Sequence, residues 1–330
     1  MTALTYERAA DAAGAIASGA RDGARYLGGG TNLVDLMRLG IEAPRALVDV
    51  SRLDGEIADT AQGGLRIGAG VTNSAAAADR RVRERYPLLA RAILSGASAQ
   101  IRNMATVGGN LMQRTRCAYF YDPAARCDKR APGAGCDAVG GFNRLHAILG
   151  AAGGCAATHP SDMAVALAAL DAVVSVRGAD GARDIALTDL YRLPGETPWI
   201  ETTLRPGELI VAVTLPPRRA GDRCAYRKVR DRASFAFALV SVAARIAVED
   251  GVVRGVGLAL GGVGAKPWRA FAAEAALIGK PATAETFRAA ARAELAPAVA
   301  LRDNAFKIDL AERLIVDTLV GLTSNAETAP

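Results

Sequence analysis

The sequence predicts an α+β fold made of more than one packed unit. At 330 residues the chain is about twice the length of a typical domain. Helix and strand patterns alternate through its first third, and its last third combines a strand pair with helices. Hydrophobic residues make up 51% of the chain and charged residues 22%, which is typical of a globular protein with a sizeable core. We therefore expect two or three units.

The first third begins with alternating elements. Thr5 is placed to cap an alanine-rich helix that runs through Ser18. Farther along, Thr72 or Asn73 caps a second helix, which Pro87 interrupts or restarts because proline lacks a backbone N–H. Between these helices, strands are expected at residues 25–27, 46–50 and 65–71, and a short helix at residues 34–39.

The middle of the chain, residues 100–162, loses its periodicity and is rich in glycine, proline and cysteine. A structureless stretch of that length is uncommon inside a compact domain, so we expect a functional or ligand-organised loop. In the last third, two strand patterns flank the turn at residues 249–251, which predicts a hairpin. The helices and strands expected after the loop cover residues 163–170, 172–176, 237–248, 252–260, 284–294 and 305–318.

Charge and hydropathy argue against two classes of partner. The excess of Lys and Arg over Asp and Glu is 40 − 34 = 6, but basic residues are interleaved with acidic ones, so nucleic-acid binding is not indicated. The most apolar runs, such as residues 164–176, are shorter than the ~20 residues of a membrane span, so no membrane insertion is expected. The N-terminus lacks a secretory pattern, which leaves the cytoplasm or export bound to a signal-bearing partner.

Two glycine-rich turns favour a phosphate-bearing cofactor. The first is the glycine triplet at residues 28–30, between a strand and a helix, and the second is the glycine pair at residues 108–109. Glycine allows several backbone N–H groups to approach one anion. Neither turn matches the GxGxxG dinucleotide fingerprint or the Walker motif. We therefore expect a diphosphate cofactor, with plain tight turns as the alternative.

The cysteines form the second candidate site. Five cysteines in so long a chain do not make a disulfide scaffold, but four of them, Cys117, Cys127, Cys136 and Cys155, fall within one irregular stretch. They lack the close CxxC pairs of zinc ribbons, whereas a 4Fe–4S cluster takes four cysteine ligands. Residues 128–135 add cationic side chains that could offset the charge of such a cluster. Zinc and buried free cysteines remain the alternatives.

The remaining cysteine and the two histidines do not match a known catalytic or metal-binding motif. Cys224 adjoins a strand and is expected to pack there. His146 and His159 lack a metal-ligand partner at helical spacing, and His159, which precedes Pro160, is expected to shape a turn. The sequence contains no convincing Ser-His-Asp, Cys-His or paired-carboxylate site, so we expect no catalytic residues of these kinds.

Taken in order, the motifs resemble a known family. Residues 28–33 (GGGTNL), 67–72 (IGAGVT), 106–110 (TVGGN) and 161–162 (SD) are similar to the FAD-binding domain of xanthine dehydrogenases, carbon monoxide dehydrogenase flavoproteins and bacterial aldehyde oxidoreductases. The resemblance runs nearly the whole length. It implies a two-part FAD-binding domain of the PCMH type, followed by an α+β domain like the carbon monoxide dehydrogenase flavoprotein C-terminal domain. The implied parts are residues 1–55 and 56–220 for the two FAD-binding subdomains, with an iron–sulfur loop at 112–160, and residues 221–330 for the C-terminal domain.

One segment, residues 112–160, departs from most members of this family; we call it the cysteine loop. The corresponding connection is usually short, but here it is long and holds the four clustered cysteines. Two subgroups with an extra 4Fe–4S cluster are similar in this respect, periplasmic aldehyde oxidoreductase and hydroxybenzoyl-CoA reductase, and the flanking residues look closer to the first. The resemblance implies one 4Fe–4S cluster ligated by Cys117, Cys127, Cys136 and Cys155.

The same resemblance implies where FAD binds. Asp162 would accept hydrogen bonds from cofactor hydroxyls, since an ionised carboxylate is only an acceptor. Ile210 aligns with an apolar residue near the flavin ring, and Lys228 with a basic residue at the flavin. The residues implied to hold the pyrophosphate are Tyr26, Leu27, Gly28, Gly29, Gly30, Thr31, Asn32 and Leu33, closed over by Thr106, Gly109 and Asn110.

The implied function is that of an electron-transfer subunit in a molybdenum-dependent aldehyde oxidoreductase. A large partner with molybdopterin would oxidise the substrate, and a small partner with 2Fe–2S clusters would pass electrons to this FAD and on to an external acceptor. The protein's part is to position and tune the cofactor. The alternatives are a flavin subunit of a hydroxybenzoyl-CoA reductase-like or xanthine dehydrogenase-like complex, and a stand-alone flavin oxidoreductase. Likeness to a periplasmic complex is compatible with co-export to the periplasm.

Overall fold

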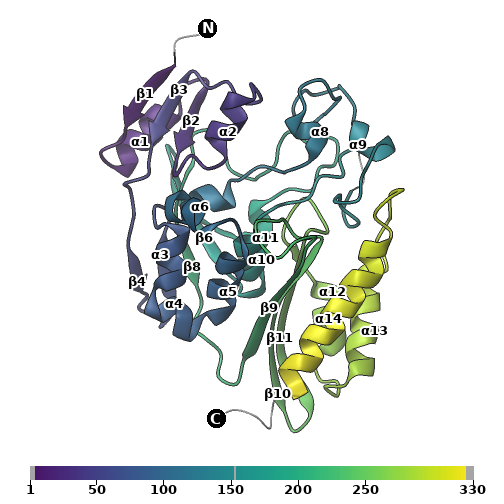
Figure 1. Cartoon of the computed structure of the whole chain (residues 1–330). Helices are drawn as coiled ribbons and strands as arrows, with labels where there is room; N and C mark the ends of the chain where they lie inside the picture. The colour runs from purple at the N-terminus through teal and green to yellow at the C-terminus, as the bar shows by residue number, and fades with distance from the viewer. Residues whose placement is uncertain (1–3, 152–153, 325–330) are drawn as a thin grey trace.

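The structure is a computed structural model that describes residues 4–151 and 154–324. Its strands form three sheets that follow one another along the chain, with helices packed around them (Figure 1). The first sheet has the strand order β1-β3-β2, the second β4-β5-β8-β6-β7 and the third β12-β11-β10-β9. This mixture of helices and separate sheets confirms the predicted α+β fold.

The first sheet is parallel, and one of its strands replaces part of an expected helix. Thr5 was expected to cap a helix but begins β1, which pairs in parallel with β3. The helix starts only at Ala12, because the Asp11 side chain accepts a hydrogen bond from the Gly14 backbone N–H at 2.7 Å. A strand of four residues is too short to show its period in the sequence, so that prediction was wrong. The elements are β1 (Thr5–Arg8), α1 (Ala12–Gly19), β2 (Ala24–Leu27), α2 (Leu33–Arg38) and β3 (Ala46–Asp49).

The second sheet is antiparallel and shares one hydrophobic core with helices α3, α4, α5 and α10. Thr72 caps α3 by accepting a hydrogen bond from the Ala75 N–H at 3.2 Å, and Pro87 starts α5, as expected for a residue without an N–H. The strands are β4 (Ile57–Asp59), β5 (Leu65–Gly68), β6 (Val173–Gly178), β7 (Gly181–Ala186) and β8 (Leu209–Leu215). The helices are α3 (Asn73–Ala78), α4 (Arg80–Arg85), α5 (Pro87–Ser95), α6 (Ala99–Met104), α7 (Val107–Leu111), α10 (Asp162–Ala169) and α11 (Leu187–Leu190).

The third sheet contains the predicted hairpin. Asp250 and Gly251 connect β10 and β11 with φ angles of 50° and 74°, the left-handed pair that a tight two-residue hairpin turn requires. Three helices pack against this sheet and enclose a second hydrophobic core (Figure 1). The elements are β9 (Arg223–Val229), β10 (Val240–Glu249), β11 (Val252–Gly261), β12 (Trp268–Arg269), α12 (Phe271–Leu277), α13 (Ala284–Leu295) and α14 (Phe306–Ser324).

The segment expected to lack secondary structure is partly helical. Helices α6 and α7 begin at hydroxyl caps, Ser98 and Thr106, whose local hydrogen bonds do not depend on apolar periodicity. The cysteine loop adds α8 (Ala118–Tyr121) and α9 (Asp137–Gly140), which lie in the upper right of Figure 1, above α14. The loop leaves and rejoins the domain at one place, where the Thr115 hydroxyl donates to the Thr158 carbonyl at 3.0 Å. Across the two described stretches, no helix is long and apolar enough to cross a membrane.

Candidate cofactor site

Two cavities meet beside the glycine-rich turns. The Asp162 cavity, lined by Asp162 and Lys228 among others, has a volume of about 650 Å³, and the Tyr26 cavity, lined by Tyr26 and Ile210 among others, has about 660 Å³. Cavities of this size suit a cofactor. The lining shared by both cavities, which we call the junction, consists of Thr31, Asn32, Gly109, Gln113 and His159. The two cavities are therefore halves of one site.

The two glycine-rich turns, residues 28–33 and 106–110, pack directly on each other and form what we call the glycine cradle. A Cβ atom on Gly29 would lie 1.8 Å from the Met104 carbonyl oxygen, and one on Gly28 would lie 2.7 Å from the Thr106 hydroxyl. No side chain fits at either position without movement of the backbone or of Thr106. The glycines are therefore required by the close approach of two backbones.

The main chain of the first turn presents unused hydrogen-bond donors. Within the described part of the chain, the backbone N–H groups of residues 29–33 donate to no protein acceptor. Consecutive free N–H groups of this kind form a concave site for an anion. The turn borders the junction through Thr31 and Asn32, so an anion held there lies between the two cavities.

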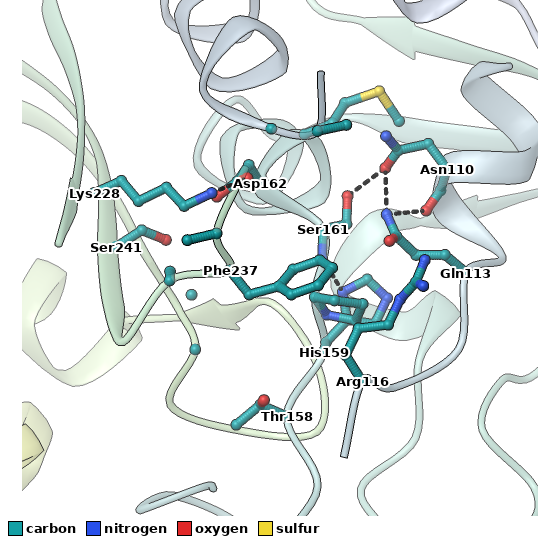
Figure 2. Close-up of a pocket in the computed structure, with 18 of the residues that line it drawn as sticks. Asn110, Gln113, Arg116, Thr158, His159, Ser161, Asp162, Lys228, Phe237 and Ser241 are labelled. Atoms are coloured by element: carbon teal, nitrogen blue, oxygen red, sulfur yellow. Dashed lines mark hydrogen bonds and ion pairs between the residues drawn. The ribbon is translucent and has the colours of Figure 1, made fainter. Parts of the chain in front are cut away.

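Asp162 is the centre of a buried charged group in its cavity (Figure 2). The Lys228 ammonium lies 2.7 Å from one carboxylate oxygen, and the Tyr226 hydroxyl donates to the other at 2.5 Å. Burial, followed by the Asp162 charge, raises the pKa of Tyr226 well above its ordinary value, so the phenol stays protonated. A carboxylate has about four acceptor positions, so Asp162 keeps capacity for a ligand hydroxyl after both contacts are made.

Buried polar atoms without a partner gather around the same cavity. In the described part of the chain, six buried side-chain N or O atoms have no hydrogen-bond partner, and five of them belong to residues that line the Asp162 cavity. Buried polar atoms are normally paired, so such a concentration gives the cavity a polar lining suited to a polar ligand. The five are Asn73 Oδ1, Arg116 Nε, His146 Nδ1, His159 Nε2 and Ser241 Oγ, and Figure 2 shows several of these side chains around the cavity.

A buried ionic network joins the glycine cradle to the cysteine loop. Arg114 forms ion pairs with Glu42 at 2.7 Å and with Glu201 at 2.5 Å, and its own backbone N–H donates to Asn32 Oδ1 at 2.8 Å. Lys129 contacts Glu201 from the other side at 2.9 Å. Burial opposes ionisation of Glu201, but the charges of Arg114 and Lys129 outweigh it and lower its pKa. No sequence motif marks these residues, because the partners are far apart along the chain.

The clustered cysteines are neighbours in space. Cys127 and Cys136 face each other in an isolated antiparallel bridge. Burial raises the pKa of Cys117 to about 11, and Cys127 and Cys155 add to the rise, as charged groups do only at short range. Cys117 Sγ also lies 3.1 Å from His146 Nε2. Even so, the described residues contain no group of three or more His, Cys, Asp or Glu side chains arranged to hold a metal ion.

The structure brings most of the predicted cofactor residues to the two cavities. Leu27 lines neither, and its carbonyl instead accepts a hydrogen bond from Val50 N. Ile210 and Lys228, both aligned with flavin contacts, line different cavities. His159, which was expected only to shape a turn, lines both cavities. Around the Tyr26 cavity lie Tyr26, Gly28, Gly29, Gly30, Thr31, Asn32, Leu33, Thr106, Gly109 and Ile210, and around the Asp162 cavity Asn110, Asp162 and Lys228.

Comparison with known protein families shows which family the chain belongs to. Residues 2–218 match the model of the FAD-binding domain in molybdopterin dehydrogenase. The chain belongs to this family. Residues 224–320 of the flavoprotein match the carbon monoxide dehydrogenase flavoprotein C-terminal domain. The family assignment confirms the resemblance inferred from the motifs, and it supports FAD as a cofactor of the chain.

Relatives of the flavoprotein are named as subunits or chains of larger enzymes. It is 53% identical to the aldehyde oxidoreductase FAD-binding subunit PaoB of Escherichia coli, over 99% of this chain and 100% of the relative. It is 28% identical to the glyceraldehyde dehydrogenase medium chain of Sulfolobus acidocaldarius, over 78% of this chain and 75% of that one. A structure of carbon monoxide dehydrogenase from Hydrogenophaga pseudoflava has the same fold, with a TM-score of 0.76 at 24% identity, covering 98% of each chain.

Proposed function

We propose that this flavoprotein is the electron-transfer subunit of a molybdenum-dependent aldehyde oxidoreductase. The observation that carries the proposal is the run of free N–H groups at residues 29–33, located where two large cavities meet. A diphosphate suits such a site. The 53% identity to an aldehyde oxidoreductase FAD-binding subunit over the full chain supports the choice of enzyme.

FAD fits the residues present. The glycine cradle would hold the pyrophosphate through its free N–H groups, and each cavity would take one half of the cofactor. In the Asp162 cavity, the unpartnered atoms of Asn73 and Ser241 can pair with polar atoms of that half. Asp162 would accept a hydrogen bond from a cofactor hydroxyl while its carboxylate stays paired with Lys228 at 2.7 Å. The Tyr26 cavity, which Ile210 lines, would take the half of the cofactor on the other side of the pyrophosphate. Bound FAD supplies the redox chemistry by exchanging one or two electrons, while the protein positions it and limits access of water.

We also propose that the cysteine loop holds a 4Fe–4S cluster with Cys117, Cys127, Cys136 and Cys155 as ligands. Such a cluster takes four thiolates. The bridge between Cys127 and Cys136 supports the closeness of two of the ligands. Burial raises the pKa of Cys117 and of Cys155, so these two thiols stay protonated until a metal displaces the protons. Burial raises the pKa of Cys155, and the charge of Lys129 opposes that rise; the same charge would offset part of the cluster charge.

The proposed partners are a molybdopterin-binding large subunit and a 2Fe–2S small subunit, which would deliver electrons to FAD for an external acceptor. The names of the relatives as medium chains and subunits support this. A stand-alone flavin oxidoreductase is the rival. Purification separates the two: the relay subunit elutes with larger partners and has little turnover alone, whereas the rival is active by itself. Cell fractionation of the complex tests co-export to the periplasm against a cytoplasmic location.

The first experiment measures flavin and iron after anaerobic purification. FAD with about four irons per chain is the expected result. A folded protein with neither would overturn the proposal, and FAD without iron would overturn the cluster alone. Cys127→Ser should lose iron, and Cys224→Ser is the matched control, since Cys224 is also a free cysteine but lies in β9. Equal iron in both variants would contradict the ligand assignment.

A further inference from the structure

Helix α2, which follows the glycine triplet, is anchored by the cysteine loop. Leu36 is the buried residue of this helix and is 1% exposed. It belongs to a small core of its own, formed with Phe120 and Cys127, which are 0% and 6% exposed. Both partners come from the cysteine loop. Helix α2, which follows the first turn of the glycine cradle, therefore depends on the cysteine loop for its packing.

The cysteine loop also holds the cradle through Asn32. The Oδ1 atom of Asn32 accepts a hydrogen bond from Arg114 N at 2.8 Å, and its Nδ2 donates to the Tyr121 hydroxyl at 3.2 Å. The same hydroxyl accepts from Arg116 Nη1 at 2.9 Å, which fixes its orientation. Both ends of the amide are thus used by the loop, and the backbone N–H of Asn32 is one of the free donors of the cradle.

Ion pairs are a third connection between the cysteine loop and the segment around α2. Glu42, shortly after α2, is ion-paired to Arg114, and through Glu201 the network reaches Lys129 inside the cysteine loop. The side chains of Glu42 and Lys129 are 14% and 6% exposed, so the network is largely screened from water. Apolar packing, an amide clamp and ion pairs therefore all run from the cysteine loop to the same short segment.

We propose that the cysteine loop sets the affinity for FAD, with Phe120 and Tyr121 as positioning residues, and that filling of the cysteine site and FAD binding are coupled. This rests on the proposed function. A loop ordered by its metal holds α2 and Asn32 in place, so the free N–H groups converge without a further ordering cost. Coupling of binding free energies is reciprocal, so bound FAD must retain the metal to the same degree.

The first test compares two equally buried phenylalanines in the full chain, purified with the subunits that accompany it. Phe120→Leu should raise the dissociation constant for FAD about tenfold, within the usual range of coupling. Phe287→Leu is the control, because Phe287 is also 0% exposed but lies in the C-terminal core. It should lower thermal stability and leave FAD affinity unchanged. Equal FAD affinity in the two variants would overturn the proposal.

Two further measurements separate positioning from general stability. Tyr121→Phe keeps the ring, loses the hydroxyl that Asn32 contacts, and should weaken FAD binding less than Phe120→Leu does. Chelation of iron should weaken FAD binding in the wild type but add little in Phe120→Leu, since the link is already broken. Additive effects of chelation and substitution would contradict the coupling. A wild type that binds FAD but never contains iron would overturn the proposed cluster and its coupling to FAD. Phe120→Leu and Tyr121→Phe would still test whether these two residues position the FAD site.

Discussion

The glycine cradle and the cysteine loop lie side by side but are held in different ways. In the cradle, two backbones touch because side chains are absent, as at Gly29, and the resulting free N–H groups follow from local conformation. The cysteine loop is held by long side chains whose partners come from elsewhere in the chain, such as Arg114 with Glu201. A feature that depends on neighbouring residues appears as a short motif in the sequence. A feature that depends on pairs of residues far apart in the chain does not.

The largest expected effect comes from filling the backbone contact of the cradle. Gly29→Ala places a Cβ 1.8 Å from the Met104 carbonyl oxygen, so the backbone must move. We expect a loss of stability beyond the ~3 kcal/mol usual for overpacking, together with loss of FAD. Urea unfolding and flavin content measure both. Gly55→Ala is the control, since no atom lies within 4 Å of its added Cβ; comparable losses in the two variants would refute the packing argument.

Breaking the ionic network should cost about as much as a buried ion pair. Glu201→Gln leaves Lys129, whose side chain is 6% exposed, without its carboxylate, and we expect destabilisation of about 3 kcal/mol. Urea unfolding measures it. Asp22→Asn is the control, because its pair with Arg45 is exposed and contributes little. If both substitutions had the same small effect, the network would not hold the loop.

The same carboxylate predicts a dependence on pH. The pKa of Glu201 is lowered below its ordinary value of 4.5, despite burial, by Arg114 and Lys129. Its contribution to stability is therefore fully present above pH 4.5 and is lost as pH falls through the lowered folded-state pKa. Unfolding free energies measured below pH 4.5 should fall less steeply in Glu201→Gln than in the wild type. Parallel curves would show that Glu201 does not titrate as proposed.

A smaller effect is expected in the Asp162 cavity. Asp162→Asn removes the charge that neutralises Lys228 and weakens one acceptor for FAD, so FAD binding should weaken by about 1.5–3 kcal/mol. Fluorescence titration with FAD gives the constant. Asp35→Asn, at a residue that also lines this cavity, should have little effect. Unchanged flavin retention in Asp162→Asn would remove Asp162 from the site.

The smallest effect concerns one hydrogen bond at the Tyr26 cavity. The Tyr26 hydroxyl donates to the Gly207 carbonyl at 2.7 Å and ties β2 to the loop before β8. Tyr26→Phe keeps the ring and should cost about 1 kcal/mol of stability. Thermal unfolding tests this, and a loss several times larger would mean that the hydroxyl has a further role.

The sequence was most informative where structure is local. The hairpin at Asp250 and Gly251, the cap at Thr72 and the start of α5 at Pro87 follow from conformational preferences of single residues. The predicted start of α1 was wrong because Thr5 pairs with β3, which is distant in the sequence.

The candidate site divides in the same way. The glycine turns were visible as motifs, and the structure places them at the junction of the cavities. His159, Ser241 and Glu201 were not found, because a lone polar residue acquires its meaning only from neighbours brought together by folding. The pairing of Tyr121 with Asn32 across 89 positions is of this kind.

The hydrogen bond from Thr115 to Thr158 brings the two ends of the cysteine loop together. A segment that departs and returns at one point can be gained or lost in evolution without rethreading the domain around it. The loop, with its helices α8 and α9, could accordingly be transplanted onto a related flavoprotein as a unit. The recipient would need counterparts of Leu36 for Phe120 to cover, of Asn32 for the hydrogen bonds and of Glu42 for the ion pair. Inheritance of the loop would then be tied to those three positions of the host domain.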